Sequence, residues 1–272
     1  MITLDDGKTT KKLSDFGFRE LTDHSNPSQP PFDRRTVSIP GREGTWEFDS
    51  EIGERPANIP VKYLAMSETE FQTKLNEFNQ FFYDEFGQPK ELKLIYDYEK
   101  DKYIYVKLAQ NFSPDRQTIL KSIDIPFIST KPRKQARFLP SEITWGSDVI
   151  DFTFPYQFGL GRNGEGGVVD KQITAPQTIS VVAEGLAVKP VLILEGSGNN
   201  VSISNGETLI NVGNFANAKW EIDCNNYISY KNGVETFLNM SEFWLMPTTN
   251  DIIIAGTSLN FRFSVEFRNR YL

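Results

Sequence analysis

Short segments of alternating apolar and polar residues recur through the second half of the chain, and they restrict its fold more than any other feature. Over Phe261–Arg268 every second residue is Phe or Val, and the intervening residues are Arg, Ser or Glu. A period of two places one set of side chains on each face of a strand. Trp220–Cys224 shows the same alternation, and Asn205-Gly206 and Asn232-Gly233 are turn pairs typical of hairpins. This half is therefore predicted to be an antiparallel β-sandwich of short strands without a helix.

The first half mixes strands with one predicted helix. Ser67 and Glu70 have the spacing of an N-terminal capping box, and Gly87 followed by Pro89 predicts the helix end. Between them four apolar residues recur at helical spacing and form a single stripe, namely Phe71, Leu75, Phe78 and Phe82. No polar residue interrupts the stripe to orient a ligand, so it predicts a core contact and not a cofactor pocket. The fold class is therefore mainly β with one helix in an α+β N-terminal domain.

A hairpin is predicted before that helix. Thr36–Ile39 and Thr45–Phe48 read as strands, and the five residues between them form a glycine-containing turn, namely Pro40, Gly41, Arg42, Glu43 and Gly44. The Pro-rich segment 23–33 in front of it is predicted to be an exposed loop. Two further strands, Leu92–Tyr96 and Tyr103–Leu108, flank a charged turn.

A basic, proline-containing segment predicts the domain boundary. It contains Lys131, Arg133, Lys134 and Arg137 around Pro132, without interleaved aromatic residues. A solvated linker fits this composition better than a phosphate-binding patch. We therefore predict an N-terminal domain at residues 1–131 and a C-terminal domain at residues 132–272.

Net charge, cysteine content and the lack of long apolar segments exclude several classes of protein. The net charge is −7, which gives no electrostatic footprint for binding phosphate backbones. A single cysteine, Cys224, excludes an intrachain disulfide. No run of about 18 apolar residues is present, and the first residues lack the apolar core of a signal peptide, so we expect cytoplasmic synthesis and no membrane contact.

Few residues point to catalysis or metal binding. His24 is the only histidine, and with Cys224 it makes a very weak zinc site. Gly159–Gly164 matches G-x-G-x-x-G, but the β-branched residues that follow leave no helix to hold a pyrophosphate. Asp97, Glu99 and Asp101 are better explained by a charged hairpin turn than by calcium, since the glycine and terminal Glu of an EF-hand loop are lacking. We expect no enzyme, no cofactor and no metal; a hydrolase with scattered carboxylates is the weakest alternative.

Several motifs in order resemble one family. Val37–Gly44 looks like the PGR-x-G hairpin of siphophage distal tail proteins. In the second half, Trp220–Cys224 is followed by Ser241–Pro247, Asn250–Ile254 and the closing Phe267–Leu272 in the order typical of that family. The Pro-rich loop at 23–33 departs from the pattern.

The resemblance implies a structural virion protein at the tail tip. Members form a hexameric ring with a belt domain around a channel and a galectin-like β-sandwich outside. Such a ring joins the major tail tube protein to the tail-associated baseplate hub protein, with the tape-measure protein in the axis. DNA passes through the channel without specific binding. Assembly would take place in the host cytoplasm.

Two alternatives remain open, one for the role of the turn at residues 40–44 and one for the function of the chain. The turn Pro40–Gly44 is either part of the ring interface or an ordinary hairpin turn. The alternative function is a carbohydrate-binding module, because exposed aromatic rings of a sandwich domain stack on sugars. Its candidate residues are Trp220, Trp244, Tyr227 and Tyr230. The strongly apolar neighbours of Trp220 and Trp244 instead predict that these two lie in the core.

Overall fold

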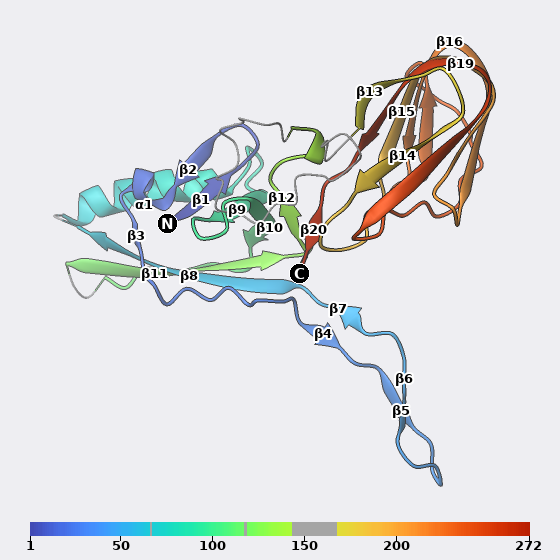
Figure 1. Cartoon of the computed structure of the whole chain (residues 1–272). Coiled ribbons are helices and arrows are strands. Elements are labelled where there is room, and N and C mark those ends of the chain that lie inside the picture. Colours follow the sequence, from blue (N-terminus) through green and yellow to red (C-terminus); the bar gives the residue numbers. More distant parts are fainter. Residues whose placement is uncertain (66, 117–118, 143–167) are drawn as a thin grey trace. The chain divides into compact units, whose positions relative to one another are not determined.

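The computed structural model describes residues 1–65, 67–116, 119–142 and 168–272. The chain divides into two compact units, residues 1–134 with Leu272, and residues 135–271. Both units are built of antiparallel strands, and α1 (Glu68–Phe82) is the one α-helix of the described residues (Figure 1). The predicted fold class, mainly β with one helix, is confirmed. The domain roles assigned to 1–131 and 132–272 stay a prediction.

The first unit is a single large sheet with a projecting ribbon. Its sheet strands follow the order β2-β1-β9-β10-β11-β8-β3. Their bounds are β1 (Ile2–Asp5), β2 (Thr10–Lys12), β3 (Arg19–Glu20), β8 (Arg55–Leu64), β9 (Leu92–Tyr96), β10 (Lys102–Leu108) and β11 (Leu120–Ser129), with the 3₁₀ turn η1 (Leu13–Phe16) after β2. The ribbon strands are β4 (Phe32–Asp33), β5 (Thr36–Ser38), β6 (Thr45–Glu47) and β7 (Glu51–Ile52).

Helix α1 packs its predicted stripe into the core of this unit. All four stripe residues are buried, and the Phe82 ring lies 5.7 Å from that of Phe127 on β11. Burial of each such side chain contributes about 1.5–3 kcal/mol before entropy is subtracted. Ser67 Oγ accepts a hydrogen bond from the Glu70 amide at 3.1 Å, so half of the capping box is present. The Glu70 carboxylate instead accepts from the Tyr63 hydroxyl, and the helix ends at Phe82, before Gly87.

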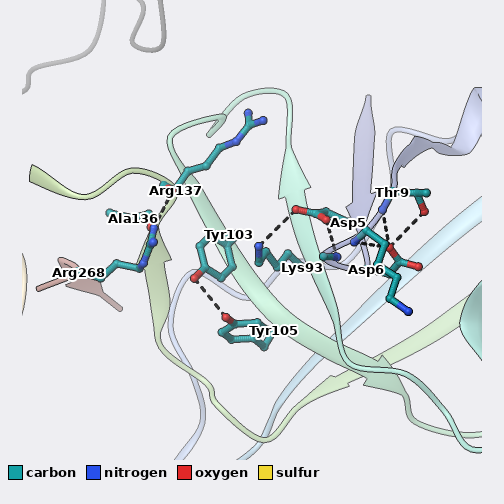
Figure 2. A network of polar contacts seen from close by, with 11 residues as sticks. Asp5, Asp6, Thr9, Lys93, Tyr103, Tyr105, Ala136, Arg137 and Arg268 are labelled. Atoms are coloured by element: carbon teal, nitrogen blue, oxygen red, sulfur yellow. Dashed lines mark hydrogen bonds and ion pairs between the residues drawn. The ribbon is translucent and has the colours of Figure 1, made fainter. Parts of the chain in front are cut away.

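The turn between β1 and β2 is held by two neighbouring aspartates (Figure 2). Asp6 Oδ1 accepts hydrogen bonds from the Thr9 and Lys8 amides at 2.7 and 2.9 Å. Burial raises the pKa of Asp6, but these hydrogen bonds outweigh it and the net shift is downward. Lys93 Nζ on β9 lies 3.4 Å from Asp5 Oδ2, which ties the turn to the neighbouring strand.

The second unit is a seven-stranded antiparallel sheet in the order β13-β19-β15-β16-β17-β18, with β14 also paired to β19. The bounds are β13 (Val168–Ile173), β14 (Gln177–Val182), β15 (Val191–Ser204), β16 (Leu209–Asp223), β17 (Ile228–Lys231), β18 (Val234–Glu235) and β19 (Thr249–Glu266). Outside the sheet are β12 (Lys134–Ala136), where the chain passes between the units, the 3₁₀ turn η2 (Pro140–Glu142) and β20 (Arg270–Tyr271). Beside β20, Arg268 Nη1 donates to the Ala136 carbonyl at 2.7 Å (Figure 2).

The central strands of this unit are long and irregular, whereas short strands were predicted. On β15 the buried side chains change from even positions, Leu192 and Leu194, to odd positions, Val201 and Ile203. Register shifts between Gly196 and Ser202 account for the change. A Cβ at Gly196 would lie 2.4 Å from the Asn260 carbonyl oxygen, and its φ of +143° favours glycine. Such bulges let one long strand bury residues on both sides of the irregularity in the same core.

Candidate assembly surface: an exposed two-stranded arm

Residues 31–54 form an antiparallel ribbon, here called the arm, that extends away from the sheet of the first unit (Figure 1). β4 pairs with β7 at Phe32↔Ile52, and β5 pairs with β6 at Val37↔Trp46. Every residue of the arm is exposed. A lone two-stranded ribbon is marginally stable in water at best. Packing within its own unit therefore does not explain why the arm forms an ordered ribbon.

The outer part of the arm has one apolar face. Side chains at Val37, Ile39, Trp46 and Phe48 share this face, because positions two apart and directly opposed residues point the same way. These four side chains, here called the apolar face, are 50%, 44%, 50% and 57% exposed. Thr36, Ser38, Thr45 and Glu47 occupy the other face. Monomeric soluble proteins seldom leave such a patch uncovered, so the apolar face has the properties of a binding surface.

Charged side chains line the arm and two of its three arginines are paired. Arg35 Nη2 lies 2.6 Å from Glu51 Oε2, and Arg34 Nε lies 3.7 Å from Glu47 Oε1. Arg42 instead places its guanidinium over the Trp46 ring, 4.4 Å from the centroid. Each exposed ion pair contributes little to stability. The predicted interface residues Pro40–Gly44 form the tip of the arm, where the Arg42 amide donates to the Ile39 carbonyl.

A buried arginine holds the base of the arm, and the sequence did not predict its burial. Arg55 follows the arm directly and is 1% exposed. Its Nη1 donates to the Pro132 carbonyl at 3.3 Å, and its Nη2 donates to the Pro27 carbonyl. Burial lowers the pKa of Arg55. A single Arg at a strand start carries no local signal of burial, so only the tertiary structure reveals this role.

The loop before the arm is fixed to the β9–β10 turn, which corrects its prediction as a plain exposed loop. His24 stacks on Tyr96 and Tyr98 with ring centroids 5.5 and 5.8 Å away. The Tyr98 hydroxyl lies 3.1 Å from His24 Nε2 and accepts from Asn26 Nδ2 at 2.9 Å. The lone histidine thus lies in a packing contact, with no second histidine available for chemistry.

Two of the four sugar-binding candidates lie together in the second unit. Lys189 Nζ is 4.4 Å from the centroid of Tyr227 and 4.6 Å from that of Trp244. Glu242 accepts from the Tyr227 hydroxyl and from Trp244 Nε1, each at 3.1 Å. Hydrogen bonds from Trp244 and Tyr227 lower the pKa of Glu242. One face of each of these two rings is thus in contact with a lysine of the same chain.

The other two candidates are not part of that cluster. Trp220 is 4% exposed and belongs to the hydrophobic core, as expected from its apolar neighbours. Tyr230 is half-buried on β17 and faces Glu221 across the ladder. Sugar binding stays a prediction. If the protein binds glycans, a Trp244→Ala variant that keeps its fold but loses this binding would support the sugar site.

Other candidate chemistry has a structural explanation or lies outside the described residues. Cys224 is buried, and burial raises the pKa of its thiol to about 12. Glu99 pairs with Lys102 of the same charged turn at 3.2 Å, and with Lys134 from outside the turn at 2.7 Å. Gly159–Gly164 falls outside the described ranges. Within those ranges there is no metal-binding group of three His, Cys, Asp or Glu, and no helix is long and apolar enough to cross a membrane.

Comparison with known proteins gives a tail-protein domain and a full-length fold. Residues 11–129 match the family model described as phage tail protein RIFT-related domain. The structure matches SPP1 Dit with a TM-score of 0.69 at 13% identity, over 100% of both chains, and that protein is described as a paradigm of the hub adsorption apparatus in phages infecting Gram-positive bacteria. A chain of the phage P2 baseplate in its activated conformation with Ca gives a TM-score of 0.46 at 12% identity over 100% of both chains. Comparison with curated protein sequences gives no match.

These matches cover the sheet, the helix and the arm that were just described. The match begins within β2 and runs to the end of β11, and it includes the whole arm. The family model that these residues match is one of phage tail proteins. Residues 11–129 thus match a phage tail protein RIFT-related domain, and the chain has, along its full length, the fold of SPP1 Dit.

Proposed function

We propose that this chain forms a closed ring at the distal end of a siphophage tail, as a hub component of the baseplate. The arm carries this proposal, since it presents an apolar face to solvent on an element that its own unit does not cover. The full-length Dit fold supports the same role, because SPP1 Dit is described as part of a hub adsorption apparatus.

The partner of the arm in this proposal is a second copy of the chain. A ring requires one surface of each subunit to bind a different surface of the next, with a rotation that closes. An arm that leaves the body of its unit can reach a neighbour in this way. Six copies is the number that the family resemblance implies. The first unit would form the belt around the channel and the second unit the outer galectin-like domain.

The remaining partners follow from a position at the tail tip. The ring would join the tail tube protein to the tail-associated hub protein and surround the tape-measure protein, in the virion, after assembly in the host cytoplasm. DNA would later cross the channel without being bound. The net charge of −7 supports such passage, because a chain with net negative charge weakly repels the phosphates of DNA.

Light scattering over a range of concentrations tests the ring. We expect masses well above the 31.0 kDa of one chain, near six copies, with rings visible by negative stain. Deleting Arg42–Gly44 should leave a folded protein that no longer forms rings. A protein that stays at the mass of one chain at every concentration would contradict self-assembly through the arm.

Two neighbours on opposite faces of β6 give a matched control. Trp46→Ser removes the largest side chain of the apolar face, whereas Glu47→Ser changes only the polar face. We expect the first to weaken assembly at least tenfold, which corresponds to about 1.4 kcal/mol, and the second to have a much smaller effect. Equal effects of the two substitutions would show that the apolar face is not the contact.

A further inference from the structure

A groove lies on the solvent-facing side of the β8–β11 pair in the first unit. It has a volume of about 810 Å³ and is bounded by β8, β11 and the segment 109–115 that follows β10. This volume is in the range of clefts that bind a ligand or a few side chains of a partner. The groove therefore offers a preformed receptor on the same unit that carries the arm.

The lining of the groove combines an apolar wall with carboxylates. Its accessible apolar residues are Pro56, Ala109, Phe112, Pro126 and Ile128. Asp115 and Asp124 add negative charge. Asp124 projects from β11 into solvent, and within the described residues its carboxylate has no hydrogen bond or ion pair. A partner with an apolar group next to a cation would satisfy both features.

The outer part of the arm presents that combination. Trp46 is half exposed, and Arg42 lies against one side of its ring. Arg34 and Arg35 have carboxylate partners on the arm, whereas Arg42 has none among the described residues. An aromatic side chain paired with an arginine is the kind of anchor on which protein interfaces depend.

We propose that the groove of one copy binds Arg42 and Trp46 from the arm of the next copy. Trp46 packs against the apolar wall, and the Arg42 guanidinium reaches Asp124. A chain cannot insert these residues into its own groove, because its arm begins beside Pro56 and extends away from the sheet (Figure 1). The contact joins two different surfaces, as a head-to-tail ring requires. It deepens the proposed function and depends on it.

Charge reversal tests the pairing with two variants that lie at exposed sites. Arg42→Asp places a carboxylate opposite Asp124, and Asp124→Arg places a guanidinium opposite Arg42. In each variant alone, the affinity of one copy for the next should fall at least tenfold, since like charges then face each other. In an equimolar mixture every alternating contact pairs Asp with Arg, so assembly should return to near the level of the unmodified chain. Glu85→Arg, at an exposed position after α1, is the matched control and should assemble normally.

The possible outcomes distinguish a failure of the proposed groove contact from a failure of the proposed ring. Assembly of Asp124→Arg alone at the unmodified level, with loss in Arg42→Asp, would overturn the groove as receptor and leave the arm as ring-forming. Two defective variants whose mixture stays dissociated would overturn the direct Arg42–Asp124 contact. An unmodified chain that never assembles would instead overturn the proposed function itself. Circular dichroism and thermal unfolding of each variant show that any loss is not a folding defect.

Discussion

The arm and the central strands of the second unit use the same sequence pattern for different ends. β5 and β6 alternate apolar and polar residues as β15 and β19 do. In the second unit the apolar side chains on one face of these strands are buried in one core, whereas in the arm every apolar side chain is exposed. Alternation therefore specifies a strand with one apolar face, and only the rest of the molecule decides whether that face packs internally or awaits a partner.

Truncation of one phenylalanine in each region should give the largest difference. Phe263 on β19 is fully buried, so Phe263→Ala should lower the free energy of unfolding by about 3–5 kcal/mol. Phe48 on the arm is 57% exposed, and Phe48→Ala should change it by less than about 0.5 kcal/mol while weakening assembly. Urea unfolding at a concentration where the protein is dissociated measures both. A loss of several kcal/mol in Phe48→Ala would show that the arm packs internally.

Glycine substitution separates a tight bulge from an open turn. Gly196→Ala should destabilise the second unit by about 1–3 kcal/mol, because the backbone conformation disfavours a side chain and the new Cβ meets the Asn260 carbonyl. Gly44 at the arm tip also has a positive φ, but no atom lies within 4 Å of a Cβ there. Gly44→Ala should strain the tip locally and leave the unfolding midpoint nearly unchanged. Thermal unfolding measures both variants. An equal fall of the two midpoints would contradict the difference between the bulge and the turn.

A serine in the body and one in the arm should differ by a smaller amount. Ser67→Ala removes the hydrogen bond to the Glu70 amide at the start of α1 and should lower the free energy of unfolding by about 1 kcal/mol. Ser38→Ala, on the exposed polar face of β5, should be close to neutral. Chemical denaturation resolves a difference of this size. A neutral Ser67→Ala would mean that the cap does not stabilise the first unit.

Acid sensitivity should give the smallest effect. Burial raises the pKa of Glu99, but Lys134 and Lys102 outweigh it and the net shift is downward. The pair therefore adds stability above the ordinary Glu pKa, near 4.3, and this is lost as the pH falls through the lowered value. Glu99→Gln should remove less than about 1 kcal/mol at pH 7 and flatten the acid limb of the stability curve. Glu51→Gln on the arm is the control, and an identical acid limb in both variants would contradict the assignment.

The local sequence predicted the helix stripe, the hairpin around Pro40–Gly44 and the closing strand. The helix and the hairpin form between near neighbours in the chain, and the closing strand has a strict alternation, so periodicity reports all three directly. The sequence did not predict the long strands β15, β16 and β19, because a bulge reverses the alternation and makes one strand look like two.

The sites that the sequence missed depend on residues far apart in the chain. Arg55 is surrounded by the carbonyls of Pro27 and Pro132, and Lys189 meets Tyr227 and Trp244 from another part of the second unit. Trp244 was expected in the core and is only half-buried. The sequence predicted the hairpin strands of the arm, but it carried no sign that their apolar residues would be exposed.

In our proposal the apolar face of the arm is exposed to solvent in the single chain and covered in the assembly. Hydrogen exchange of amides 36–48, measured at a low and a high protein concentration that differ in mass by light scattering, tests it most directly. We predict slower exchange in the arm at the high concentration and unchanged exchange in β15 and β19. Arm amides that exchange equally fast at both concentrations, although the mass has risen, would contradict the account.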